Sequence, residues 1–203
     1  MSSLPSQLLV LWLIAQPQVA TLQYAVAPAP PLNSPFAGVV ILNADRGASG
    51  DVQSITALAG AAPFLEASIS AVKQWKFAPV QGQEKPAPVS VTMFYRARQI
   101  FSSTSATQFP EWPAAETPPP LPRVIVEPSY PVNSVAEGVV ILELRISADG
   151  GIERIETVRQ VPSLTEIARK AVEGWKFTPA SINGQASSGT AIVAISFLRP
   201  VIY

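Results

Sequence analysis

Side chains that usually carry out catalysis are scarce in this sequence. The 203 residues include no histidine and no cysteine, so the commonest general base, the thiolate nucleophile and the usual zinc ligands are missing. The aspartates fall in predicted hairpins, where a short acidic side chain favours a turn: Asp45, Asp51 and Asp149. No Gly-x-Ser-x-Gly element or glycine-rich phosphate loop stands in a suitable setting. We therefore expect no catalytic residue, no metal ion and no cofactor, and infer that the protein is not an enzyme.

Charge and composition limit the remaining function classes. Fourteen basic and fourteen acidic residues give a formal net charge of zero, so the chain has no basic field that would attract nucleic acid. Apolar residues make up 48% of the chain and charged residues 14%, which is enough apolar surface for packed cores. We expect a protein partner and no nucleic acid.

The chain contains two copies of one unit, one hundred residues apart. Residues 31–80 align with residues 131–180 without a gap, and eighteen of the fifty pairs are identical, where chance gives about three. Gly38-Val-Val-Ile-Leu42 recurs as Gly138-Val-Val-Ile-Leu142, and Trp75-Lys-Phe77 recurs as Trp175-Lys-Phe177. Two copies are too few for a solenoid, so two small domains are the better interpretation.

Each copy carries the pattern of a hairpin, a helix and a third strand. In the second copy, residues 139–146 and 152–158 alternate between apolar and polar side chains around the turn residues 147–151. Ser163 and Glu166 have the spacing of a capping box, and an apolar stripe continues to Trp175. Residues 190–198 then predict a last strand. The first copy repeats this with strands over 37–44, 52–58 and 89–96 and a helix from Phe64 to Trp75.

The expected fold class is α+β, with two β-β-α-β modules. Each module is predicted to be a three-stranded antiparallel sheet with one helix packed on it. We place the first domain at residues 28–98 and the second at residues 125–203. Residues 99–124 between them are rich in Ser and Pro, which predicts an extended spacer that holds the modules apart.

The second copy resembles the TonB C-terminal domain family. The resemblance rests on Tyr130-Pro131, the glycine that opens the first strand, and Ala171-Val172 followed by Trp175-Lys-Phe177-x-Pro179-Ala180. The first copy keeps the tryptophan block but has Pro30-Pro31 in place of Tyr-Pro. The resemblance covers residues 28–98 and 125–200.

The resemblance implies protein recognition by strand addition. TonB-like domains transmit energy to outer-membrane receptors and bind a receptor peptide along the edge of the sheet, where main-chain groups are unpaired. The edge strands map onto residues 89–95 and 189–197, and Tyr130-Pro131 is expected near the same partner. The predicted partner-binding residues are Val89, Val91, Met93, Tyr95, Tyr130, Pro131, Ala191, Val193, Ile195 and Phe197.

Other large side chains are assigned to the core. Trp75, Phe77, Trp175 and Phe177 lie on or just after the apolar helical stripes, where packing explains them better than ligand binding. Exposed edges could also pair between chains to give a homodimer, or the two modules could pair with each other. The protein would then be a structural or dimerising envelope protein without a transport role.

The N-terminus indicates export. The apolar run from Leu8 to Ala15 is too short to span a bilayer and fits the core of a signal peptide, with Ala25-Val-Ala27 as the best cleavage site. We assign residues 1–27 as a signal peptide or apolar N-terminus and expect a periplasmic protein, with inner-membrane anchoring as the alternative. A complete TonB-type energy transducer has a membrane anchor, a long spacer and one C-terminal domain. Because this chain has two such domains, its sequence predicts protein recognition more firmly than energy transduction.

Overall fold

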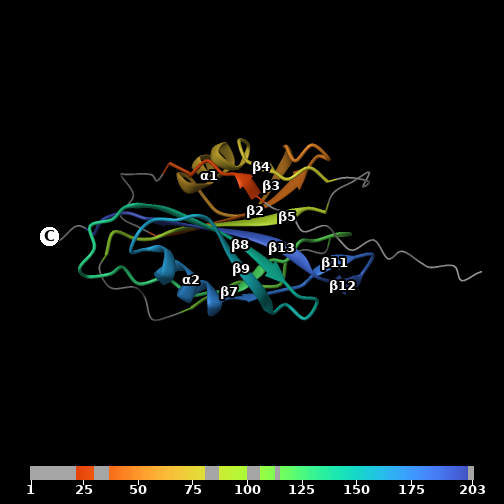
Figure 1. The fold of residues 1–203 in the computed structure, drawn as a ribbon. Helices are drawn as coiled ribbons and strands as arrows, with labels where there is room; N and C mark the ends of the chain where they lie inside the picture. Colours follow the sequence, from red (N-terminus) through yellow and green to blue (C-terminus); the bar gives the residue numbers. More distant parts are fainter. Residues whose placement is uncertain (1–21, 30–36, 81–86, 100–105, 113–114, 201–203) are drawn as a thin grey trace, which may run out of the picture.

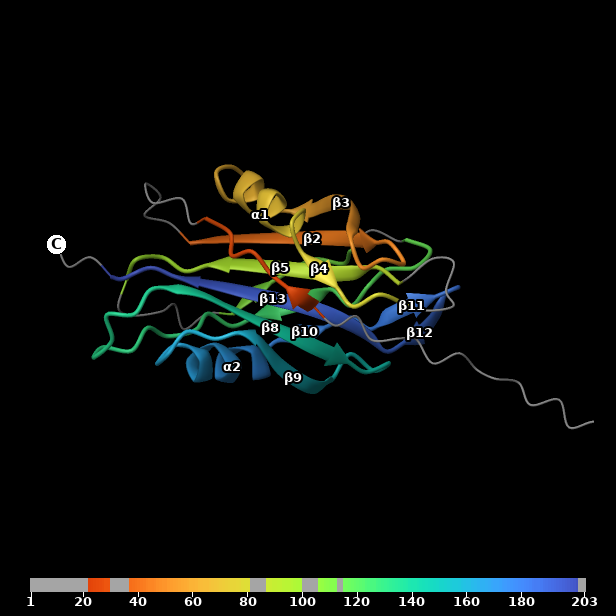
Figure 2. The ribbon, with the colours of Figure 1, turned by 45° about the horizontal axis from the view of Figure 1, so that its top comes forward.

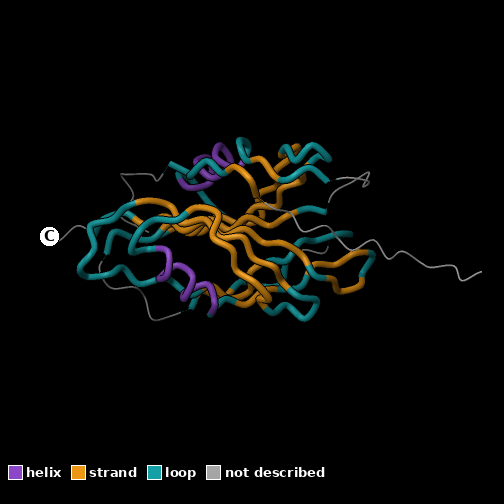
Figure 3. Tube along the Cα trace, viewed as in Figure 1, coloured by secondary structure: helices purple, strands orange, loops and turns teal. Residues whose placement is uncertain are grey.

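A single six-stranded sheet forms the centre of the molecule (Figures 1 and 3). The computed structural model describes residues 22–29, 37–80, 87–99, 106–112 and 115–200. The strand order in the sheet is β3-β2-β5-β13-β8-β9. The fold is α+β, as predicted, but the expectation of two separate three-stranded sheets is wrong, because the third strand of each copy pairs with that of the other.

The N-terminal unit comprises three strands of this sheet and one helix. Strands β2 (Gly38–Arg46) and β3 (Val52–Ala59) form a hairpin, α1 (Phe64–Val72) follows, and β5 (Val89–Tyr95) returns antiparallel beside β2. The C-terminal unit repeats the order with β8 (Gly138–Ile146), β9 (Ile152–Arg159), α2 (Thr165–Glu173) and β13 (Gly189–Phe197). Both hairpins carry register shifts near their ends, which indicate bulges.

The two helices lie on opposite faces of the sheet (Figures 1 and 2). Strands β5 and β13 run parallel. Because they are equivalent strands of the two units, they pair in parallel only if one unit is rotated about the strand direction relative to the other. This rotation places its helix on the opposite face of the sheet. Val91 and Met93 therefore point into the core beneath α1, whereas their counterparts Ala191 and Val193 point into the core beneath α2.

Each core also takes side chains from the other unit. The core beneath α1 includes Ile141 of β8 and Ile192 of β13, and the core beneath α2 includes Phe94 of β5. Successive side chains of a strand point to opposite faces, so a strand in the middle of the sheet serves both cores. Strands β5 and β13 are accordingly buried on both faces.

Short strands outside the central sheet extend each unit. In the N-terminal unit, β1 (Leu22–Tyr24) pairs with β4 (Lys76–Phe77). In the C-terminal unit, β7 (Pro122–Ile125) pairs with β10 (Lys176–Phe177) and with β6 (Thr107–Gln108), and β11 (Ala180–Ile182) pairs with β12 (Gln185–Ser187). These strands of two to four residues were not predicted, because they are too short for an alternating pattern to show.

The duplication extends further toward the N-terminus than residue 31. Trp75 Nε1 donates to the carbonyl of Val26 at 2.8 Å, and Trp175 Nε1 donates to the carbonyl of Val126 at 2.9 Å. Strands β1 and β7 are likewise equivalent. The predicted boundary after Ala27 is therefore wrong, because residues 22–27 belong to the fold. Residues 1–21, which contain the apolar run, lie outside the described residues.

The Pro-rich stretch is packed against the protein and is not a spacer. Pro119, Pro120 and Leu121 are buried, and Ser90 Oγ donates to the carbonyl of Pro120. The amide of Thr178 donates to the carbonyl of Leu121 at 2.8 Å. Polyproline geometry leaves carbonyl groups free to accept such bonds. The composition predicted an extended spacer, whereas this stretch lies against the sheet.

The predicted capping box at α2 is also wrong. The cap position is Leu164, which makes no side-chain capping bond. Ser163 has a left-handed backbone (φ 64°), and its hydroxyl pairs with Ser134 Oγ at 2.9 Å. Thr165 Oγ1 instead bridges back to the amide and carbonyl of Val161, both at 2.9 Å. The Thr165 hydroxyl thus ties the start of the helix to Val161 without capping a helix amide.

The packing of β1 can be tested by truncation. A chain that begins at Pro28 is expected to melt at a lower temperature than one that begins at Thr21. The shorter chain loses the buried Leu22, a loss of about 1.5–3 kcal/mol for a fully buried large apolar side chain. It also leaves the Trp75 N–H unsatisfied, at about 1–3 kcal/mol. Thermal unfolding of the two chains measures the difference, and equal melting temperatures would show that β1 is dispensable.

Candidate protein-binding edges

The two strands predicted to be free edges are paired with each other. Strand β13 lies parallel to β5 over six register pairs, from Ala191 opposite Ser90 to Ser196 opposite Tyr95. On their other sides, β5 pairs with β2 and β13 pairs with β8. Both strands are therefore interior strands of the sheet (Figure 2), and of the alternatives considered, the pairing of the two units with each other is the one observed.

The predicted contact residues of these strands are turned into the protein. Each has at most 3% of its surface exposed: Val89, Val91, Met93, Tyr95, Ala191, Val193, Ile195 and Phe197. Their side chains are shared between the two cores. The prediction that these residues contact a partner is incorrect for this folded form, since neither their side chains nor their main-chain groups face solvent.

Tyr130 is likewise buried, with 4% of its surface exposed. Its hydroxyl donates to the carbonyl of Ala136 at 2.9 Å, and its ring lies 5.7 Å from the guanidinium of Arg96. Pro131, which follows it, is half-buried. Tyr130 thus joins the segment before β8 to the end of β5 and does not present its ring to a partner.

Arg96 fastens the two units together and was not predicted as a site residue. It is 3% exposed, and its Nε donates to the carbonyl of Pro128 at 2.9 Å with Glu127 Oε1 at 3.8 Å. Burial lowers the pKa of Arg96, while Glu127 and Tyr130 act in the opposite direction. The second copy has Ser196 at this position, and the Arg96 amide donates to the Ser196 carbonyl at 3.0 Å. The difference between Arg96 and Ser196 was the sequence signal from which Arg96 could have been identified as a site residue.

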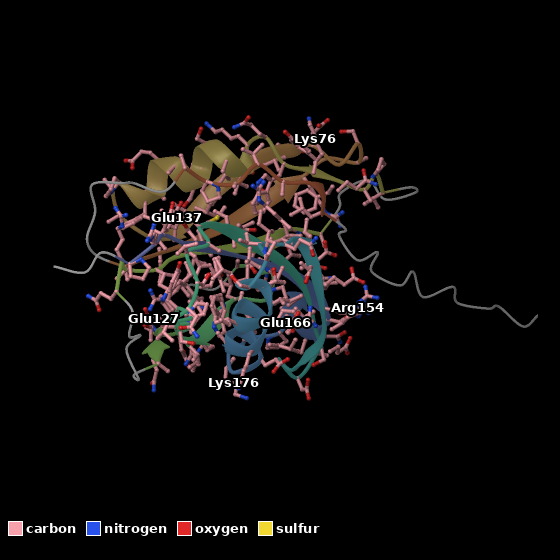
Figure 4. The ribbon with its side chains drawn as sticks, turned by 60° about the vertical axis from the view of Figure 1, so that its left-hand side comes forward. Lys76, Glu127, Glu137, Arg154, Glu166 and Lys176 are labelled. Carbon is pink, nitrogen blue, oxygen red and sulfur yellow. The ribbon has the colours of Figure 1, made fainter. Side chains whose placement is uncertain are left out.

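The repeated tryptophan block closes each helix onto its sheet. The four aromatic residues assigned to the core lie there: Trp75 is 0% exposed, Phe77 1%, Trp175 1% and Phe177 7%. The intervening lysines are exposed, and Lys76 pairs with Asp51. Figure 4 shows Lys76 and Lys176 at opposite ends of the molecule, as expected for units with inverted faces.

Comparison with protein families agrees with the resemblance that was inferred from this tryptophan block. Residues 126–198 match the family model of the Gram-negative bacterial TonB protein C-terminal domain. This segment is therefore similar to the TonB C-terminal family. The match runs from the residue after β7 to the residue after β13 and so covers the C-terminal unit. A search of curated proteins with the chain gave no match.

Similarity of the C-terminal unit to the TonB family indicates a broad class of function. The family comprises energy-transducer and protein-interaction domains of the cell envelope and is not a family of enzymes. Neither helix of the described residues is long and apolar enough to cross a membrane. The described residues also contain no cluster of acidic side chains that could hold a metal ion. Similarity to this family supports a protein partner.

The remaining edges of the sheet are β3 and β9. Strand β9 carries four charged side chains, Glu153, Arg154, Glu156 and Arg159, and Arg154 stands out from this margin in Figure 4. Arg169 of α2 donates to the carbonyl of Ile155 at 3.0 Å and so occupies one main-chain acceptor of the edge. A shallow depression of about 310 Å³ lies between β9 and α2, lined by Ile152, Glu153, Arg154, Ile155, Arg169 and Glu173.

A buried carboxylate anchors β1 to the other unit. Glu143 of β8 is 4% exposed, and its Oε2 accepts from the amide of Leu22 at 2.6 Å. Burial raises the pKa of Glu143, and Glu156 adds to this, whereas the Leu22 amide, Arg154 and Arg46 lower it. Glu143 replaces the first copy's Asn43, so this carboxylate also belongs to one unit only.

The role of Arg96 can be measured by substitution. Arg96→Gln is expected to lower the free energy of unfolding by about 1.5–3 kcal/mol, the range for buried hydrogen bonds to a charged group. Arg98→Gln is the matched control, since the Arg98 guanidinium makes an exposed bond to the Arg199 carbonyl at 3.1 Å and should contribute less than about 1 kcal/mol. Denaturant titration compares the variants, and equal losses would argue against a fastening role for Arg96.

Glu143 should make stability depend on pH. Because its folded-state pKa is raised, the folded protein holds the proton more tightly than the unfolded chain. Its favourable contribution is therefore present below the unfolded Glu pKa of about 4.3 and is lost as pH rises through the folded-state value. Glu143→Gln should remove this decline, whereas the exposed control Glu116→Gln should retain it. Unfolding titrations between pH 4 and pH 8 test this, and an unchanged slope in Glu143→Gln would contradict it.

Proposed function

We propose that the protein is a periplasmic protein-binding module of TonB type that recognises an extended peptide of an envelope or outer-membrane partner by strand addition. The observation that carries the proposal is the parallel pairing of β5 with β13 in a unit that is similar to the TonB family. A third strand of this unit thus accepts a strand along its outer side, and in this chain the accepted strand is its own.

Strand addition is driven mainly by main-chain hydrogen bonds. An edge strand presents unpaired N–H and C=O groups, and an extended peptide satisfies them with few demands on side chains. On β13, residues 191–196 find these partners in β5. The N-terminal unit therefore occupies in cis the position that a partner strand would take.

Displacement of β5 by a peptide is energetically unfavourable. Val91 and Met93 are 0% exposed and Phe94 is 4% exposed. Full burial of such a side chain is worth about 1.5–3 kcal/mol. Separation of β5 from β13 would also open both cores, whereas a short peptide would restore the main-chain bonds and little of the buried surface. Recognition is therefore proposed to occur with the two units joined.

A disulfide across the two strands tests this arrangement. Thr92 and Val193 are direct register partners, and adjacent strands lie about 4.7–4.9 Å apart, within the reach of a disulfide. The chain has no cysteine, so Thr92→Cys with Val193→Cys introduces one defined pair. Peptides copied from the N-terminal segments of outer-membrane receptors are titrated into the oxidised and the reduced protein.

The expected result is binding of at least one receptor peptide with equal affinity in both redox states. Isothermal titration calorimetry gives the affinity, and mass spectrometry confirms the bond. Absence of binding by every peptide to the reduced and the unmodified chain would refute the proposed function. Binding that disappears on oxidation and returns on reduction would show instead that β5 must leave β13.

A further inference from the structure

The outer edge of β3 differs from that of β9, although the two strands are equivalent in the duplication. Figure 2 shows β3 at one margin of the sheet beside α1 and β9 at the other beside α2. Lys76 pairs with Asp51 just before β3 begins, so the open stretch is residues 53–59. Among the described residues, none forms a hydrogen bond with the outward main-chain groups of this stretch.

The turn before β3, β3 itself and α1 carry very little charge, although Asp45 of the neighbouring β2 accepts from Ser54 Oγ. Residues 47–72, which form the turn, β3 and α1, include two charged side chains, Asp51 and Glu66. The equivalent residues 147–172 include eight: Asp149, Glu153, Arg154, Glu156, Arg159, Glu166, Arg169 and Lys170. Charged side chains on an edge strand discourage pairing with other chains. One margin of the sheet is thus protected against strand addition and the other is not.

The two helices differ in how they contact the neighbouring edge strand. At the position of Arg169, which bonds to the Ile155 carbonyl, the first copy has Ile69. An isoleucine has no donor, so it leaves the equivalent carbonyl of Ile55 open. Replacement of a capping charge by an apolar side chain at the same position makes the β3 edge both accessible and apolar.

Half-buried apolar side chains line the helix side of this edge. Val52 and Ile55 of β3 and Leu65 and Ile69 of α1 are packed against the core but retain partial exposure. On the other face of β3, Ser54 and Thr56 are exposed and polar. A strand added beside β3 would continue this alternation, with apolar side chains toward α1 and uncharged polar side chains on the opposite face.

We propose that the outer edge of β3, residues 53–59, is the docking edge for the partner protein. Its occupant is an uncharged extended segment of about seven residues whose side chains alternate between apolar and polar. This inference rests on the proposed function and assigns its site. The β9 edge, with its charges and its Arg169 bond, does not take a strand.

The test uses the full chain and a defined probe. The probe is a blocked peptide of alternating Val and Thr over eight residues with a lysine pair at each end for solubility. A second peptide with proline at a central Thr cannot continue a strand and serves as the control. Amide hydrogen exchange, followed by NMR, reports protection at each residue of the protein.

The alternating peptide is expected to slow exchange in residues 53–59 and to leave β9 unchanged, and the proline peptide should have no effect. Ile69→Arg, which recreates the Arg169 arrangement, should weaken binding about tenfold or more, a change of about 1.4 kcal/mol or more. Ser70→Arg adds the same charge at a neighbouring exposed position and should leave binding within about twofold. Unfolding curves of both variants verify that the fold is intact.

Other outcomes would overturn the assignment. Protection at β9 or at β5 and β13, or equal binding by Ile69→Arg and the unmodified chain, would place the docking edge elsewhere. Protection of β3 that appears without peptide as protein concentration rises, with a doubled mass in sedimentation, would identify a second copy as the occupant. Each of these results differs from failure of the proposed function, in which no receptor peptide binds anywhere on the chain.

Discussion

The parallel pairing of β5 with β13 determines the architecture of the whole molecule. It joins two duplicated units into one sheet, and because the equivalent strands run in the same direction it places the two helices on opposite faces. Both central strands then contribute to two cores, and the segments before each hairpin cross to the other unit, as Leu22 does toward Glu143 and Glu127 toward Arg96. A thin unit of about seventy residues would bury little surface alone, and the pairing removes that weakness.

The same pairing changes where an extended partner can bind. A solitary three-stranded unit has a free third strand, whereas in this chain both third strands are internal and the outer margins are the second strands of the hairpins. Those margins have diverged. One carries charges and a guanidinium on a main-chain carbonyl, and the other is nearly uncharged. A sheet edge that is open and apolar is a hazard for aggregation unless a strand fills it, so divergence that preserves such an edge on one side favours a binding role there.

The sequence was most informative where the two copies agree and where long alternating patterns occur. The hairpins, the helices and the third strands lie within one to three residues of their predicted positions, except that α2 begins after the predicted cap and both helices end before their tryptophans. Family resemblance was read correctly from the block around Trp175, because that block fixes how the helix meets the sheet. Between residues 22–28 and 122–128, however, only Val26 and Pro28 recur at their counterparts, so the earlier start of the duplication could not be seen.

The errors in the prediction share one physical cause. Alternation shows that a strand has two faces but does not show which chain lies beside it, so β5 and β13 were equally compatible with a free edge and with each other. Composition has the same limit for the Pro-rich stretch, since polyproline geometry suits both a solvated spacer and a segment laid across a sheet. The contacts that distinguish these cases join residues far apart in the sequence, and they are made by residues that differ between the copies. Arg96, Glu143 and Arg169 each have a residue of different chemistry at the equivalent position of the other copy. Arg96 and Glu143 form contacts between the two units, whereas Arg169 bonds to the edge strand of its own unit. In a duplicated protein, identities therefore report the shared fold, and the positions where one copy alone is charged report the contacts in which the two copies differ.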